Sequence, residues 1–228
     1  MAKINLWGCY VESRKFSYNI LARWHIKLKN ELNITTNVDV VLFPEGYIQS
    51  IDLLSEVQNL TTKTDTMIIT GYKDIQNKDR GLICDTNGNK ALDRAKTPIP
   101  RDSLIEPVVV QTSKGNVGYI LCMEILKGVE GFTSELPIDF IAHPIGTGMF
   151  SEDQFNEWLE YARRVAIKHQ CYILGTSHAD GSYKNCGISI PIAYCIDKNG
   201  KALFIAKSDT RTRIIDLDSN KVTIVDGH

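Results

Sequence analysis

The chain has 228 residues, of which 43% are hydrophobic and 23% are charged, as in an ordinary globular protein. Its 26 Lys and Arg residues and 27 Asp and Glu residues give a net charge of −1, which argues against a nucleic-acid partner. There is no apolar run of about 18 residues and no secretory signal pattern, so we expect neither a membrane span nor export. The 6 cysteines are scattered without a CxxC pair, which predicts reduced thiols in the cytoplasm.

The first half of the chain alternates apolar runs with segments of helical periodicity. Asn87-Gly88 lies between two such runs and predicts a tight β-hairpin, since both residues tolerate positive φ. Three prolines predict an extended loop over residues 95–107. We expect strands at residues 3–9, 38–43, 66–72, 81–85, 91–92, 108–111 and 117–121, and helices at residues 16–32 and 51–60.

The second half begins with a short helix expected at residues 123–127 and contains one strong helical pattern that starts at Ser151. Ser151 and Gln154 form a candidate capping box for this helix. Strands are expected at residues 138–142, 171–176, 188–196, 202–206, 213–217 and 221–225. Alternating strands and helices, followed by hairpins, predict one α/β domain with a mixed sheet or two sheets.

Three reactive side chains follow apolar, β-rich runs. Glu45 comes after VDVVLFP, Lys96 opens the proline-rich loop, and Cys122 comes after VGYIL. In α/β proteins, ligands gather outside the carboxyl ends of strands. A base, a cation and a thiol that meet there can together carry out acyl transfer through a thioester.

Each of the three residues also has an ordinary structural interpretation. Cys122 could be a core thiol, since buried free cysteines are common. A catalytic role needs more, because a cysteine attacks only as a thiolate and requires a base or a positive field nearby. Glu45 could be a solvated glutamate at a strand end, and Lys96 a solvated loop lysine. Together, however, Lys96 would stabilise the charge of the nucleophile and then of an oxyanion.

The segments LFPEGY, RAKTPIP and GYILCMEI, in this order, resemble the nitrilase superfamily, the carbon–nitrogen hydrolases. The resemblance continues in ARRVAIKHQCYILGTSH, CGISIPIAYCIDKNGKAL and TRIIDLD. It covers most of the chain from about residue 38 onward. The combination of segments is specific, whereas any one of them alone is not.

The resemblance implies an α/β fold, an αββα sandwich of two mixed β-sheets flanked by helices, in a single carbon–nitrogen hydrolase domain over residues 1–228. It implies that Glu45 is the general base and acid, Cys122 the nucleophile and Lys96 the oxyanion stabiliser, with the Met123 N–H as second oxyanion donor. It further implies an amide or N-carbamoyl substrate, no cofactor, and a homodimer or larger homo-oligomer. A true nitrilase fits less well than an amidase or carbamoylase.

The motifs of the chain depart from the family pattern at two points. Met123 stands where family members usually carry Tyr or Trp, and the loop after Lys96 reads Thr-Pro-Ile-Pro instead of containing His-Leu. A second glutamate often lies between the lysine and the cysteine and positions them. Glu106 is the glutamate available in that interval, and Asp102 is a nearby acid.

Two histidines, His143 and His178, follow expected strands and are candidates for substrate contact. His143 could also be the base of a Cys–His pair, or a hydrogen-bonded structural residue. Glu124 is interpreted as a structural acid at a helix start. His169 and Cys171 have no second ligand pair at metal spacing, so we expect no metal site.

Three rival functions stay open at this level. One is an acyltransferase that delivers the thioester to an amine. Another is a catalytically inactive relative that keeps the fold for binding or assembly. The third is a Cys–His hydrolase that uses His143. The intact Glu-Lys-Cys set argues against the inactive relative.

Overall fold

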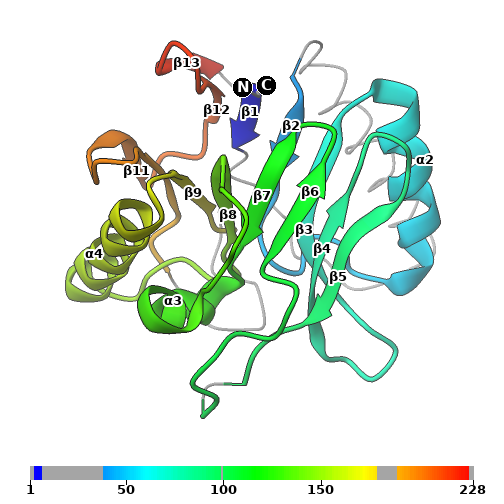
Figure 1. The fold of residues 1–228 in the computed structure, drawn as a ribbon, viewed down its shortest axis with the longest axis horizontal. Coiled ribbons are helices and arrows are strands. Elements are labelled where there is room, and N and C mark those ends of the chain that lie inside the picture. Colours follow the sequence, from blue (N-terminus) through cyan, green and yellow to red (C-terminus); the bar gives the residue numbers. More distant parts are fainter. Residues whose placement is uncertain (1–2, 7–37, 99, 179–188, 226–228) are drawn as a thin grey trace.

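The computed structural model describes residues 3–6, 38–98, 100–178 and 189–225 (Figure 1). The expected helix at residues 16–32 and the end of the first expected strand, residues 7–9, lie outside these described residues. The first sheet consists of β1 (Lys3–Leu6), β2 (Val40–Leu42), β3 (Met67–Lys73), β4 (Asp79–Cys84), β5 (Lys90–Ala95), β12 (Thr212–Asp216) and β13 (Lys221–Val225). Their spatial order is β13-β12-β1-β2-β3-β4-β5.

The second sheet has the spatial order β11-β10-β9-β8-β7-β6. It is formed by β6 (Val109–Thr112), β7 (Gly115–Tyr119), β8 (Phe140–Pro144), β9 (Tyr172–Thr176), β10 (Ile192–Ile196) and β11 (Ala202–Lys207). The strands β7, β8 and β9 are parallel, and so are β1, β2 and β3 in the first sheet. Both sheets are therefore mixed, as the resemblance implied.

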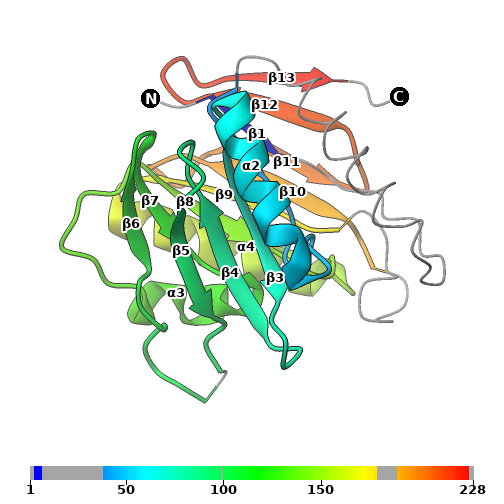
Figure 2. The same cartoon turned by 90° about the vertical axis from the view of Figure 1, so that its right-hand side faces the viewer.

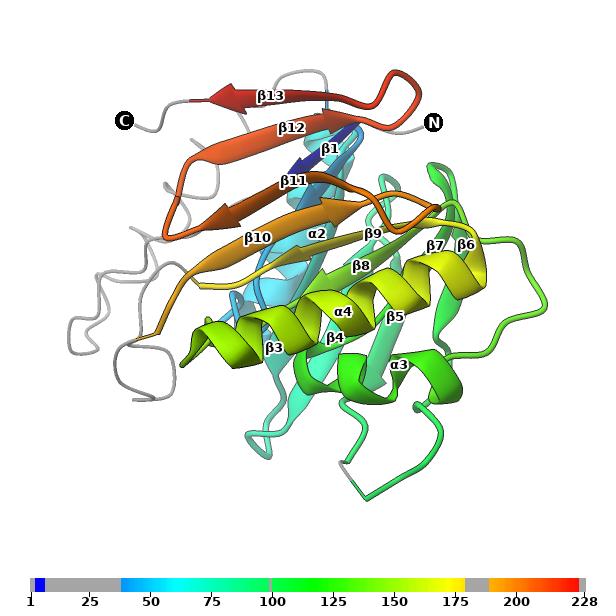
Figure 3. The same ribbon diagram turned by 90° about the vertical axis from the view of Figure 1, so that its left-hand side faces the viewer.

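The helices cover the outer faces of the two sheets. A 3-10 turn (Ile51–Leu53) leads into α2 (Leu54–Thr64), which lies across the first sheet (Figure 2). A second 3-10 turn, η2 (Cys122–Glu124), leads into α3 (Ile125–Gly131), and α3 and α4 (Glu152–His169) cover the second sheet (Figure 3). The layers are helix, sheet, sheet, helices, so the predicted αββα sandwich is confirmed. No helix in the described part of the chain is long and apolar enough to cross a membrane.

An apolar core fills the space between the sheets. It includes Val40 and Ile69 from the first sheet and Val117, Tyr119 and Phe140 from the second, all of them at most 1% exposed. Apolar surface of this kind contributes roughly 25 cal/mol per Å² removed from water. Because β2 is covered on both faces, its sequence is a continuous apolar run rather than an alternating one.

Local signals account for two details of the expected elements. Gly88 has a φ of 79° in the turn between β4 and β5, as the Asn-Gly signal predicted. The Ser151 hydroxyl caps α4 by accepting from the Gln154 N–H at 3.1 Å. The Gln154 side chain accepts from the Phe150 N–H and not from Ser151, so the predicted capping box forms only in part.

Candidate active site

The two sheets bring three strand ends to one edge of the molecule. Strand β2 is parallel to β3, and β5 runs in the direction of β3 because two antiparallel pairings separate them. Glu45 follows β2, Lys96 follows β5, and Cys122 follows β7 of the second sheet. The Glu45 N–H also bonds the Ile145 carbonyl at 3.2 Å, which joins the end of β2 to the loop after β8.

Glu45 and Lys96 form a close ion pair. The Lys96 Nζ donates to the Glu45 Oε1 at 2.6 Å, and the Glu45 side chain is 2% exposed. Burial alone would lower the pKa of Lys96, but its neighbours Cys122 and Glu45 together raise it above its usual range. Lys96 therefore stays an ammonium at neutral pH, the state in which a lysine can stabilise an oxyanion.

Cys122 lies at a sharp change of backbone direction between β7 and α3. Its φ of 51° is in the left-handed region, which non-glycine residues rarely adopt and which costs of order 1 kcal/mol. The residue is partly exposed, and its thiol is close enough to Glu45, Lys96 and the Gly146 N–H for each of them to shift its pKa. The geometry thus joins all three predicted catalytic residues.

Burial raises the pKa of the Cys122 thiol to about 12, and the Glu45 charge adds to the increase, while Lys96 and the Gly146 N–H act against it. At neutral pH the resting site therefore holds a neutral thiol beside a carboxylate. A thiol in this state attacks only if its proton leaves as the bond forms. Glu45 is placed to accept that proton, which is the arrangement of general base catalysis.

Glu124 links the two catalytic loops. Its Oε1 accepts from the Thr97 N–H at 2.6 Å, and its Oε2 accepts from the Leu121 N–H at 2.7 Å. These N–H groups belong to the residues just after Lys96 and just before Cys122. The Glu124 carboxylate also accepts hydrogen bonds from both terminal nitrogens of Arg94, at 2.8 and 2.7 Å. Four donors therefore hold one carboxylate between the segments that carry Cys122 and Lys96.

The Glu124 pair with Arg94 is buried, with side chains 1% and 2% exposed. Burial would raise the pKa of Glu124, but the Arg94 guanidinium and the two N–H groups hold it below its usual range. The sequence interpretation treated Glu124 as an ordinary acid at a helix start and missed Arg94. Their spacing, each two residues from a catalytic residue, is the signal that could have indicated the pair.

Glu106 does not occupy the expected position between the lysine and the cysteine. Its side chain is exposed and accepts from the Val108 N–H of its own loop at 2.9 Å. Glu124 makes the contacts that a second, positioning glutamate would make. The assignment of Glu106 is therefore not supported by its contacts.

The His143 ring lies beneath the nucleophile and is fully buried. Because a carbonyl can only accept, the His143 Nε2–H donates to the Cys122 carbonyl at 2.8 Å, and its Nδ1 accepts from the Tyr194 hydroxyl. The ring also stacks on Trp158, with centroids 5.8 Å apart. Both ring nitrogens are engaged away from the thiol, so this geometry favours the structural interpretation of His143 over the base.

His178 makes the equivalent contact on the other side of the site. Its Nε2–H donates to the Glu45 carbonyl at 2.8 Å, and its backbone N–H bonds the Gly146 carbonyl at 3.1 Å. The side chain is 3% exposed. The two histidines thus hold the main chain of Glu45 and of Cys122, and substrate contact by either one stays a prediction.

Replacing His143 with glutamine is expected to flatten the pH dependence of stability between pH 6.5 and 4. Burial lowers the pKa of His143 to about 4. The unfolded chain, with a His pKa of about 6.5, therefore binds a proton that the folded chain excludes, and stability falls as pH falls through this range. The loss amounts to about 3 kcal/mol at most. Glutamine does not titrate and retains an N–H donor for the Cys122 carbonyl.

The measurement is the free energy of unfolding by urea at pH 7 and pH 5, for wild type and His143→Gln. His169→Gln serves as the comparison, because His169 is only partly buried. Burial and the Lys168 charge lower the pKa of His169 as well. Equal pH slopes for wild type and His143→Gln would contradict the prediction.

A cavity of about 500 Å³ opens beside the catalytic residues. Lys96, Thr97, Met123 and Glu124 form part of its wall, whereas Glu45 and Cys122 are next to wall residues without lining it themselves. The Met123 side chain is 40% exposed, and its backbone N–H immediately follows the nucleophile. No group of three or more His, Cys, Asp or Glu residues that could hold a metal ion occurs within the described ranges.

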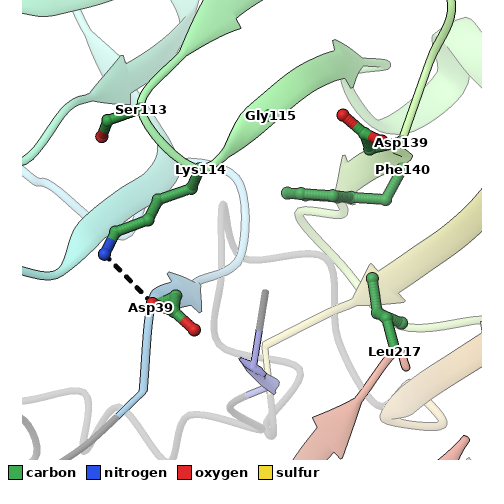
Figure 4. A pocket seen from close by; sticks show the side chains of 7 residues that line it. All are labelled: Asp39, Ser113, Lys114, Gly115, Asp139, Phe140 and Leu217. Carbon is green, nitrogen blue, oxygen red and sulfur yellow. Dashed lines mark hydrogen bonds and ion pairs between the residues drawn. The ribbon is translucent and has the colours of Figure 1, made fainter. Parts of the chain in front are cut away.

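A second cavity, of about 460 Å³, lies at the opposite edge, where the parallel strands β2, β7 and β8 begin (Figure 4). Its lysine, Lys114, donates to Asp39 at 3.0 Å, and its other acid, Asp139, accepts from the Asn116 N–H at 2.8 Å. None of Glu45, Lys96 and Cys122 lies in its wall, whereas Lys96 lies in the wall of the first cavity and Met123 there directly follows Cys122. We therefore place the candidate active site in the cavity beside Cys122.

Neither a family model nor a curated protein sequence matches this chain. Solved structures do match it. A carbon–nitrogen hydrolase from Helicobacter pylori is 17% identical over 96% of this chain and 90% of that one, with a TM-score of 0.68. A CN-hydrolase superfamily protein from Xanthomonas campestris, with an arsenic adduct in its active site, is 13% identical over 96% and 92%, with a TM-score of 0.71.

A third match is an amidase from Nesterenkonia, crystallised as a glutamate-to-glutamine mutant with the acetamide moiety of fluoroacetamide added covalently at the active-site cysteine. It is 8% identical over 98% of this chain and 90% of that one, with a TM-score of 0.65. At these identities the likeness concerns the fold. The chain therefore has the fold of the nitrilase superfamily, in agreement with the resemblance in the sequence.

Proposed function

We propose that this protein is a thiol hydrolase that cleaves the non-peptide C–N bond of an amide or N-carbamoyl substrate through a cysteine thioester. The observation that carries the proposal is that the Glu45–Lys96 ion pair lies next to the Cys122 thiol, at the edge of a cavity. The amidase among the fold relatives supports it by analogy, because its active-site cysteine carries a covalent adduct.

In the acylation half, Glu45 accepts the Cys122 proton while the sulfur bonds the substrate carbonyl carbon. The carbonyl electrons move to oxygen, and the Lys96 ammonium and the Met123 N–H stabilise the resulting oxyanion. The C–N bond then breaks as Glu45 returns the proton to the leaving nitrogen. Ammonia or an amine departs, and the acyl group remains on Cys122 as a thioester.

In the deacylation half, Glu45 takes a proton from water as the water oxygen bonds the thioester carbon. The same two donors stabilise the second oxyanion. The C–S bond breaks, the proton passes from Glu45 to the sulfur, and the carboxylic acid leaves. An acyltransferase would differ only in the acceptor, since an amine would replace water in this half.

The test is alkylation by iodoacetamide followed by peptide mapping, with amide turnover measured in parallel. Cys122 is expected to react much faster than Cys84, Cys171 and Cys195, which are at most 2% exposed. Hydroxylamine added during turnover is expected to yield a hydroxamate, which reports a thioester, and Cys122→Ala is expected to yield none. If Cys122 labels no faster than the buried cysteines, the enzyme proposal fails and the inactive relative replaces it.

A further inference from the structure

The cavity beside Cys122 contains uncompensated positive charge. Its wall includes Lys78, Asp79, Lys96, Glu124 and Lys127. The three lysines and two acids nearly balance in charge. The electrostatic field in the cavity therefore depends on which of them are paired with other residues of the protein. A low-dielectric cavity wall strengthens whatever charge is left over.

Three of the five charged groups are neutralised within the protein. The Glu124 carboxylate is paired with Arg94, and Lys96 is paired with Glu45. Asp79 lies 3.0 Å from the Lys73 ammonium. A charged group far from the scissile bond would have to compete with these short contacts, so none of the three offers a free charge to the distal end of a substrate.

Lys78 and Lys127 are left. In the described part of the chain, the Lys78 ammonium has no side-chain partner. Lys127 has one carboxylate within reach, that of Asp102, at 3.7 Å and fully exposed to water. Such a pair is worth little and is easily exchanged for a better one. The cavity therefore presents two available ammonium groups.

The two lysines come from different elements. Lys78 lies in the turn between β3 and β4, and Lys127 lies on α3. Figures 2 and 3 show this turn, α3 and the loop after β5 at the same edge of the molecule. The same wall also contains the apolar side chains Ala95, Leu104, Met123 and Leu126. A methylene chain fits such a wall, and a few polar groups then orient the ligand.

We infer that the substrate is an amide whose acyl chain ends in a carboxylate, and that Lys78 and Lys127 bind this carboxylate and determine specificity. The inference rests on the proposed function, because it places the scissile amide at Cys122. The acyl chain would lie along the apolar wall, with its charged end at the lysines. The two ends of the substrate would thus be recognised by separate parts of the cavity.

The experiment compares two probes of similar length, glutaric acid monoamide, which is anionic, and pentanamide, which is neutral. Binding is measured by NMR titration of Cys122→Ala, which cannot form the thioester. The anionic probe is expected to bind about tenfold more tightly at low salt, and its advantage should shrink as salt rises. Hydrolysis of both probes by wild type is measured alongside.

In the Cys122→Ala background, Lys78→Met and Lys127→Met are each expected to reduce the ratio of anionic to neutral affinity by about threefold to tenfold. Lys63→Met is the matched control, because Lys63 is exposed on α2, outside the cavity, and should leave the ratio unchanged. Lys78→Arg, which keeps the charge, should retain most of the preference.

The outcomes separate the two proposals. If wild type hydrolyses pentanamide as well as the monoamide, and the lysine variants do not change the affinity ratio, the inference is overturned and the thiol hydrolase stands. If neither probe is hydrolysed but the monoamide binds in a manner that depends on Lys78, the hydrolase fails and the anion site stands. Binding of neither probe overturns the inference.

Discussion

Glu45→Gln is expected to lower amide turnover by about a hundredfold to ten-thousandfold, the range for loss of a general base, while making the Cys122 thiol easier to ionise. Glutamine cannot accept the thiol proton, so the chemical step is lost. The Glu45 charge also helps to raise the pKa of Cys122 to about 12. Without that charge the Lys96 ammonium is unopposed, and the thiol pKa falls. Turnover and thiol ionisation therefore move in opposite directions.

Two measurements check this prediction. One is kcat/KM for amide hydrolysis, and the other is the rate of Cys122 alkylation by iodoacetamide from pH 6 to 10. For Glu45→Gln the alkylation profile should shift to lower pH. Glu157→Gln is the control, because Glu157 is exposed on α4 and should change neither quantity. If Glu45→Gln keeps its turnover while His143→Ala loses it, the Cys–His mechanism replaces the one proposed here.

Glu124→Gln is expected to cause the largest loss of stability, about 3 to 5 kcal/mol. Arg94 would remain charged with a side chain only 2% exposed, and an amide cannot neutralise it. The carboxylate now accepts from four donors, and the NH₂ group of a glutamine would point one further donor at one of these four. The N–H groups of Thr97 and Leu121 would no longer both be bonded, so the two catalytic loops would loosen as well.

Urea unfolding and amide turnover together test this role. The double variant Arg94→Met, Glu124→Gln leaves no unpaired buried charge, so it should recover part of the stability but not the activity. As a control, Glu152→Gln removes an exposed pair with Lys207 and should change the free energy of unfolding by less than about 1 kcal/mol. Full recovery of turnover in the double variant would show that Glu124 does not position the loops.

Local sequence patterns predicted most of the strands and helices because these patterns depend on near neighbours. Apolar runs indicated β2 and β3, the Asn87-Gly88 turn indicated the β4–β5 hairpin, and the 3.6-residue period indicated α4. The expected strand at residues 38–43 shortens to Val40–Leu42. Its apolar ends still pack in the core, because burial continues beyond the paired residues.

The sequence by itself determined the fold class, the apolar strand ends and the order in which Glu45, Lys96 and Cys122 follow them. Cytoplasmic location and homo-oligomeric assembly stay predictions that rest on the sequence. Only the tertiary structure decided which polar groups support the site. Glu124 lies 30 residues from Arg94, and His178 lies 133 residues from the Glu45 carbonyl that it binds. Periodicity and turn chemistry report contacts within a few residues, whereas these bonds exist only after two sheets have packed face to face.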